Sequence, residues 1–358
     1  MLIERGVLTR ALKTLITVID RKAISPFDHV RFEPAPNGVA ITASDGTMSA
    51  SLTVPSDGSI DVCVPARDLL AAASGAANGD WLALAVDNRE AVTVTYSGAE
   101  ARLPNSPSFD FRAASLGGDD GGPRHQVDAG PFSAALAWVS PAMCIDDITR
   151  LHLGSVLLEG DQVVATDGHR LHVATVAGLG LPRALVPAKV VQLLLRVLGG
   201  QGPLEIMDGD GVIRFATEAW SVRTRLLDQA QFPPYRQVIP ERAAAIFTME
   251  IEAGHLAAAV RRVGVSRTGR QTVPLLMTAN GQIVLATTSA EVLRVASVDP
   301  TSSTHDDSAG DHVIGIDGRY LRDACDLTGE IVLRFGDVLA PIVVDAGARL
   351  AVVMPMRL

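Results

Sequence analysis

The chain has 358 residues, of which 47% are apolar, 20% charged and 4% aromatic, and its formal net charge is −9. This composition excludes a disordered chain, and the length predicts two or three domains whose cores are built from Ala, Val, Leu and Ile. No stretch is long and apolar enough to cross a membrane. Three well-separated cysteines (Cys63, Cys144 and Cys325) favour a reduced, cytoplasmic protein over a disulfide framework or a zinc site.

Helical periodicity predicts six helices, two in each third of the chain. In chain order they cover 7–19, 66–75, 131–142, 187–198, 254–264 and 318–325. Runs with a two-residue period separate them and predict strands, among them 38–42, 162–164 and 282–285. Two helices among many short strands in each third is an α+β pattern rather than strict βαβ alternation.

Short polar blocks follow these three strand runs. Residues 43–46 (ASDG) and 165–168 (ATDG) predict turns between strands, and 286–289 (ATTS) is expected to be the third such turn although it lacks the glycine. Residues 208–211 (DGDG) predict a hairpin turn, because the later ligands of a calcium loop are absent.

Several short sequence blocks recur along the chain at a nearly constant spacing. Leu8, Phe132 and Leu256 occupy the same place in the first helix of each third, 124 residues apart. Residues 64–67 (VPAR) recur 122 residues later as 186–189 (VPAK), and the ASDG block recurs with the same offset. Blocks that repeat in the same order at nearly the same offset predict three tandem copies of one domain.

Linker composition gives the expected domain boundaries. A Gly- and Asp-rich stretch covers 113–124, and a Pro-rich stretch covers 231–242. The predicted domains are therefore 1–122, 123–242 and 243–358. A further polar stretch, 301–311, is expected to be an exposed loop within the third domain.

The predicted helices are basic although the protein is acidic. They contain nine basic and two acidic residues, a balance of +7, which leaves −16 for the rest of the chain. Lysine and arginine are good helix formers on solvated faces, but glutamate would serve equally and none occurs in these helices. A basic helical surface on an acidic protein favours contact with a polyanion.

Motifs for catalysis or cofactor binding are weak. The sequence has no phosphate-binding glycine loop and no His pair with metal spacing on a helix, so no cofactor or metal is expected. Asp167 and His169 are residue types suited to acid–base chemistry, but no nucleophile accompanies them. An unrelated cytosolic enzyme that uses Asp167 and His169 is therefore an alternative function.

Three segments carry a resemblance to a known family: 164–171 (VATDGHRL), 232–240 (FPPYRQVIP) and 352–358 (VVMPMRL). Together they resemble the beta subunit of bacterial DNA polymerase III, the sliding clamp, and the resemblance spans the whole chain. It implies three tandem clamp domains, each with two helices packed on antiparallel sheets. It also implies a non-catalytic processivity factor that closes as a head-to-tail homodimeric ring around duplex DNA.

The resemblance implies further partners and a pocket for their peptides. The expected partners are the polymerase III catalytic subunit, the clamp loader and other proteins with a clamp-binding motif. The expected pocket residues are Leu153, Thr166, Gly168, His169, Arg170, Leu171, Pro240, Tyr320, Val352, Met354, Pro355, Met356, Arg357 and Leu358.

Two further sets of residues complete the expectations. The DNA-facing charge is expected from Arg10, Lys13, Arg21, Lys22, Arg67, Arg150, Lys189, Arg196, Arg261 and Arg262. Arg102, Gly264 and Val265 are expected near the dimer contact. A clamp-like scaffold, or a specialised second clamp, that binds partners without encircling DNA is the alternative within the family.

Overall fold

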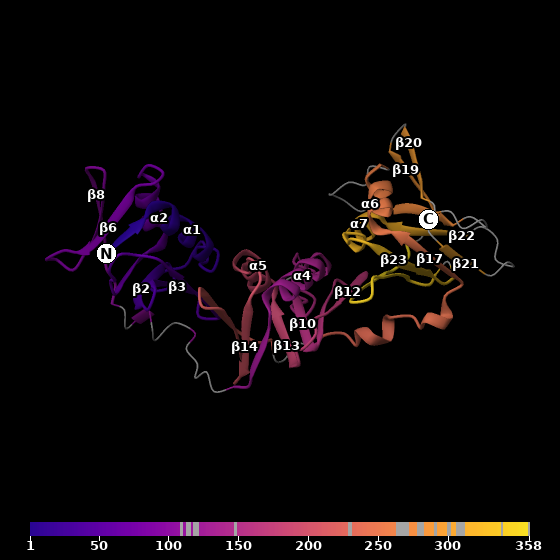
Figure 1. Ribbon diagram of the computed structural model, residues 1–358, viewed down its shortest axis with the longest axis horizontal. Coiled ribbons are helices and arrows are strands. Elements are labelled where there is room, and N and C mark those ends of the chain that lie inside the picture. Colours follow the sequence, from indigo (N-terminus) through magenta and orange to yellow (C-terminus); the bar gives the residue numbers. More distant parts are fainter. Residues whose placement is uncertain are drawn as a thin grey trace. The chain divides into compact units, whose positions relative to one another are not determined.

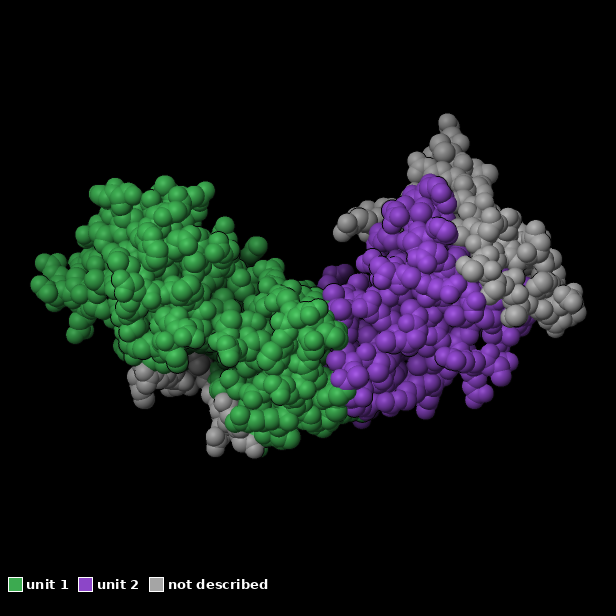
Figure 2. All heavy atoms as spheres, in the orientation of Figure 1, with its two compact units in different colours: residues 1–133, 178–228 green, residues 134–177, 229–358 purple. Residues whose placement is uncertain are grey.

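The computed structural model describes residues 1–107, 110–111, 116, 122–146, 149–227, 231–262, 272–277, 283–289, 292–298, 302–305, 312–337 and 339–356. They fall into two compact units, unit 1 with residues 1–133 and 178–228 and unit 2 with residues 134–177 and 229–358 (Figure 2). Each unit combines helices with antiparallel sheets, which confirms the predicted α+β fold class.

The described residues of unit 1 form two antiparallel sheets, which helices accompany (Figure 1). The first sheet has the order β1 (Leu2–Glu4), β6 (Trp81–Val86), β7 (Val92–Tyr96) and β8 (Ala99–Leu103). The second has the order β5 (Val62–Pro65), β2 (His29–Ala35), β3 (Gly38–Ser44), β4 (Met48–Val54), β16 (Trp220–Arg225), β15 (Val212–Ala216), β14 (Pro203–Gly209) and β9 (Arg124–Asp128). The helices are α1 (Arg5–Leu15), α2 (Ala66–Ser74) and α5 (Ala188–Val197).

Helix α1 shows why these segments fold as they do. Leu8, Leu12 and Leu15 recur at helical spacing and are fully buried, whereas Arg10 and Lys13 are exposed on the other face. In the second sheet, β4 pairs with β16, and Leu52 lies opposite Trp220. This pairing joins a strand of the first sequence repeat to a strand of the second in one continuous sheet.

Unit 2 has the same kind of organisation. Its longer sheet contains, in order, β10 (Ser155–Gly160), β11 (Gln162–Thr166), β12 (Arg170–Thr175), β25 (Arg349–Val353), β24 (Ile342–Asp345), β23 (Glu330–Phe335), β17 (Phe247–Glu252) and β21 (Ser302–His305). The other sheet has the order β20 (Val292–Val298), β19 (Ile283–Ser289), β18 (Thr272–Met277) and β22 (His312–Asp317). Helices α6 (Ala253–Arg262) and α7 (Gly318–Ala324) belong to this unit.

The described residues between the sheets include further helical segments. The chain passes from unit 1 to unit 2 within α4 (Ala129–Val139) and returns before β13 (Leu181–Pro187). Short 3-10 turns follow at η1 (Ser140–Ala142), η2 (Tyr235–Val238) and η3 (Arg242–Ala244). No helix among the described residues is long and apolar enough to cross a membrane.

All six predicted helices are confirmed, with ends that differ by a few residues. The predicted hairpin turn at 208–211 is also confirmed, since Asp210 and Gly211 have φ angles of 52° and 71° between β14 and β15. The three cysteines are free thiols, and Cys63 and Cys325 are buried.

Two local expectations are wrong. Residues 286–289 belong to strand β19 instead of forming a turn, because without the Asp-Gly pair nothing stops the strand there. Residues 302–305 of the predicted loop 301–311 form β21, which pairs with β17, and the other residues of that stretch lie outside the described residues. Both errors come from polar, glycine-poor segments whose backbone is satisfied by neighbouring strands.

Candidate functional site

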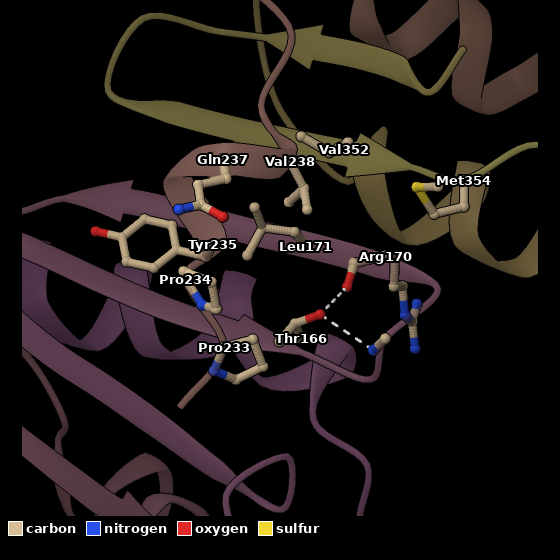
Figure 3. A pocket seen from close by; sticks show the side chains of 11 residues that line it. Thr166, Arg170, Leu171, Pro233, Pro234, Tyr235, Gln237, Val238, Val352 and Met354 are labelled. Carbon is tan, nitrogen blue, oxygen red and sulfur yellow. Dashed lines mark hydrogen bonds between the residues drawn. The ribbon is translucent and has the colours of Figure 1, made fainter. Parts of the chain in front are cut away.

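An apolar pocket of about 270 Å³ lies within unit 2 (Figure 3). Its first wall is the pair of strands β12 and β25, in which Leu171 lies directly opposite Val352. Both side chains are buried, while Met354, just beyond β25, is 39% exposed at the edge. The full lining is Thr166, Gly168, Arg170, Leu171, Pro233, Pro234, Tyr235, Gln237, Val238, Val352 and Met354.

The turn between β11 and β12 fixes one side of this pocket. The Thr166 hydroxyl donates to the carbonyl oxygen of Arg170 at 2.6 Å and accepts from the N–H of Gly168 at 3.1 Å. Asp167 Oδ1 accepts from the N–H groups of His169 and Arg170. Gly168 has a φ of +87°, a conformation that glycine adopts without strain. The TDGHR sequence is therefore a turn that presents Leu171 and Arg170 at fixed positions.

A second, charged cavity of about 390 Å³ adjoins the same turn. Asp167 and His169 line it, alternating along the chain with Thr166 and Gly168 of the apolar pocket. The His169 ring stacks on Tyr320 of α7 with 6.5 Å between ring centroids. Burial, followed by the charge of Asp167, raises the pKa of Tyr320 above its ordinary value, so this ring stays neutral at physiological pH.

The structure brings together some of the expected pocket residues and separates others. Thr166, Gly168, Arg170, Leu171, Val352 and Met354 line the apolar pocket, and His169 and Tyr320 line the charged cavity. Leu153 is buried outside both linings. Pro240 lines a third cavity, of about 110 Å³, with Phe335 and Pro341.

The C-terminal segment follows the wall of the pocket. The Met354 N–H donates to the His169 carbonyl oxygen at 2.9 Å, and the Met356 N–H donates to that of Gly315 at 2.8 Å. Pro355 and Met356 are half-buried. Arg357 and Leu358 lie outside the described residues.

Sequence reasoning missed five lining residues: Pro233, Pro234, Tyr235, Gln237 and Val238. The segment 232–240 contributes to the family resemblance and is the sequence signal for these residues, of which the resemblance implies only the neighbouring Pro240. In the structure, Tyr235 and Val238 of η2 line the apolar pocket, whereas Pro240 lies beyond η2 and lines the third cavity.

All ten basic residues expected to face DNA have exposed side chains. On α5, Lys189 and Arg196 lie seven residues apart and so share a face of the helix. Lys189 is also bonded internally, to Asp45 Oδ2 at 2.5 Å and to the Val18 carbonyl oxygen at 2.6 Å. On the edge strand β8, Arg102 pairs with Asp87 at 2.6 Å. Gly264 and Val265 lie outside the described residues.

The geometry does not support acid–base chemistry by Asp167 and His169. The carboxylate of Asp167 accepts two backbone N–H groups and the Arg170 Nε, which is the hydrogen bonding of a turn. Within the described residues, no group of three or more His, Cys, Asp or Glu side chains is placed to hold a metal ion. The enzyme alternative therefore gains no support from the hydrogen bonds of Asp167.

Comparison with known proteins links this architecture to one family. A family model described as the central domain of the DNA polymerase III beta subunit matches residues 131–234. Over 100 residues the chain is 37% identical to the beta sliding clamp of Salmonella typhimurium, an alignment that spans 26% of this chain and 27% of that protein.

Solved structures match over the full length. The DNA polymerase III subunit beta of Pseudomonas aeruginosa is 23% identical with a TM-score of 0.83, and the match covers 100% of both chains. The sliding clamp of Bartonella birtlesii, solved bound to griselimycin, is 25% identical with a TM-score of 0.82, covering 100% of this chain and 99% of that one.

Proposed function

Because the chain belongs to the family of DNA polymerase III beta subunits, the bacterial sliding clamps, we propose that it closes as a ring-shaped homodimer around duplex DNA and tethers replication proteins there. Members of this family are non-catalytic processivity factors in DNA replication. The observation that carries the proposal is the full-length likeness in fold to solved clamps, combined with the apolar pocket in unit 2.

The proposed domains are 1–122, 123–242 and 243–358, joined head to tail within the chain. The sequence repeats support them, and so do the two strand pairings that join consecutive repeats, β4 with β16 and β12 with β25. Such a chain leaves an edge strand at each end, and closure with a second copy would pair those edges. A protein that stays a 37.6 kDa monomer at micromolar concentration in light scattering would contradict the ring.

The proposed DNA contacts are mobile and made to phosphates. The exposed arginines and lysines of α1, α5 and α6 support these contacts. Phosphate contacts carry no sequence information, which suits a protein that slides along DNA. We include Arg21, Lys22, Arg67 and Arg150 in this set because each is exposed.

The proposed partner site is the apolar pocket, occupied by an extended peptide with Leu or Phe anchors. Buried strand residues, two prolines and the thioether of Met354 suit apolar side chains of varied shape. Each buried anchor is worth about 1.5–3 kcal/mol, so a few anchors give micromolar affinity.

The direct test removes residues 354–358, of which Met354 lines the pocket. Calorimetry with a synthetic peptide from the C-terminus of the cognate polymerase should show micromolar binding to the wild type and none to the truncated protein. The truncated protein should remain a dimer like the wild type, because the proposed ring contacts lie outside residues 354–358. Equal binding by both proteins would overturn the assignment of the pocket.

A further inference from the structure

Arg170 lines the apolar pocket, but its guanidinium is engaged elsewhere. Nε donates to Asp167 Oδ2 at 3.0 Å, one terminal nitrogen donates to Asp323 Oδ2 at 2.6 Å, and the other donates to the carbonyl oxygen of Pro141. The same group lies over the Tyr320 ring, 4.4 Å from its centroid. In Figure 3 the guanidinium points away from Leu171 and Val238.

These contacts connect three separate elements of unit 2. Asp167 belongs to the turn after β11, Pro141 to η1 at the end of α4, and Asp323 to α7 of the third repeat. The Arg170 side chain is only 10% exposed, and its planar fork suits several fixed acceptors at once. Arg170 thus ties the pocket-forming turn of the second repeat to a helix of the third.

A matching arrangement occurs at the junction of the first two repeats, in unit 1. There Lys189 of α5 donates to Asp45 Oδ2 and to the Val18 carbonyl oxygen, just after α1. Asp45 and Asp167 occupy the same place in their repeats, 122 residues apart, and Val18 corresponds within a residue to Pro141. In both places one cation joins an aspartate turn, the end of a first helix and the second helix of the next repeat. The cation comes from the helix in unit 1 and from the turn in unit 2.

We propose that Arg170 is a positioning residue that holds consecutive repeats together and thereby sets the shape of the partner pocket, rather than a group that bonds the partner peptide. The inference rests on the proposed peptide site. We call each set of bonds, around Arg170 in unit 2 and around Lys189 in unit 1, a clasp. The residues of the Lys189 clasp do not line the apolar pocket, so the role that the two clasps share is to join repeats. In unit 2 the joined turn is also a pocket wall, and the His169 carbonyl oxygen on that turn holds the Met354 N–H.

The proposal predicts that Asp323, which is absent from the apolar lining, controls peptide affinity through Arg170. Asp323→Asn and Arg170→Met should each weaken the polymerase peptide by about tenfold, the usual scale of coupling between sites. The double variant should bind no more weakly than either single variant, because both substitutions remove the Arg170–Asp323 bond. Asp323 Oδ1 also accepts from Arg322, which does not line the apolar pocket. The variant Asp323→Glu keeps the negative charge, so it should bind the peptide with an affinity within about threefold of that of the wild type.

Asp45→Asn is the matched control, since it breaks the corresponding clasp in unit 1. It should lower the thermal midpoint but leave peptide affinity unchanged, and Arg170→Lys gives a milder variant should Arg170→Met fail to fold. Asp323→Asn binding within twofold of wild type, or additive losses in the double variant, would overturn the proposal. If the wild type binds no peptide, the proposed function fails first and this inference falls with it.

Discussion

His172 is a buried histidine with one hydrogen bond and an aromatic neighbour. Its Nδ1 donates to the Trp138 carbonyl oxygen at 2.9 Å, and the two rings lie 4.5 Å apart. Burial, with a smaller contribution from the charge of Arg170, lowers its pKa from 6.5 to about 4. The folded protein therefore holds the ring neutral where the unfolded chain already binds a proton.

This shift makes stability depend on pH in a defined direction. The contribution is fully present above pH 6.5 and is lost as the pH falls toward 4, because only the unfolded state gains the proton. Between pH 7.5 and pH 5 the loss should be about 2 kcal/mol. Urea unfolding of the wild type and of His172→Asn at both pH values measures it. A wild-type slope equal to that of the variant would contradict the assignment.

The cysteines should differ in reactivity. Burial raises the pKa of Cys63 to about 12 and raises that of the fully buried Cys325 as well. Cys144 is half-buried and lines the charged cavity. A thiol reagent at pH 8 should modify Cys144 first and the other two only on unfolding, as mass spectrometry of peptides would show. Early modification of Cys63 would mean that its strand opens in the native state.

At the residue scale, sequence reasoning identified half of the pocket. The turn that places Thr166, Gly168 and Leu171 at the apolar pocket is predictable from the TDGHRL run, because its turn chemistry and its place before a strand are local properties. Val238 and Tyr235 were missed because their contribution depends on how η2 packs against β12 and β25. The engagement of Arg170 by Asp323, 153 residues away, has no signal in one sequence.

In helix α4, Phe132 occupies the position that Leu8 and Leu256 hold in the other repeats, and it packs in the core. Phe132 is fully buried and stacks on Phe215 of β15, with 5.8 Å between centroids. Phe132→Ala should lower the free energy of unfolding by about 3–5 kcal/mol, because it removes a ring from a packed core. Ala134→Gln, at an exposed position of the same helix, is the control and should change little. A loss below 1 kcal/mol, measured by denaturant unfolding, would show that the core refills the space.

Helices were easier to predict than strands. The six helices carry their own periodicity, so their existence followed from the sequence alone. The strand at 302–305 did not, because its polar residues are held by pairing with β17, more than fifty residues earlier. Pairing partners at that distance are set by the tertiary fold.

For the whole molecule, the charge distribution predicts how DNA binding responds to salt. The unloaded protein should bind duplex DNA weakly and without sequence preference. The logarithm of the binding constant should fall with the logarithm of salt concentration, with a slope of about −0.9 for each phosphate neutralised. Fluorescence anisotropy between 25 and roughly 200 mM salt measures the slope. Replacing Arg10 and Lys13 by glutamine should make it shallower, whereas sequence-specific binding would contradict phosphate contact.

Whether the protein encircles DNA can be measured through the topology of the DNA. The protein is loaded with its clamp loader and ATP onto nicked circular plasmid and separated from free protein by gel filtration. We expect the protein to stay on the circle through a high-salt wash and to be released when one restriction cut makes the plasmid linear. Retention on the linear DNA, or no retention on the circle, would contradict the ring.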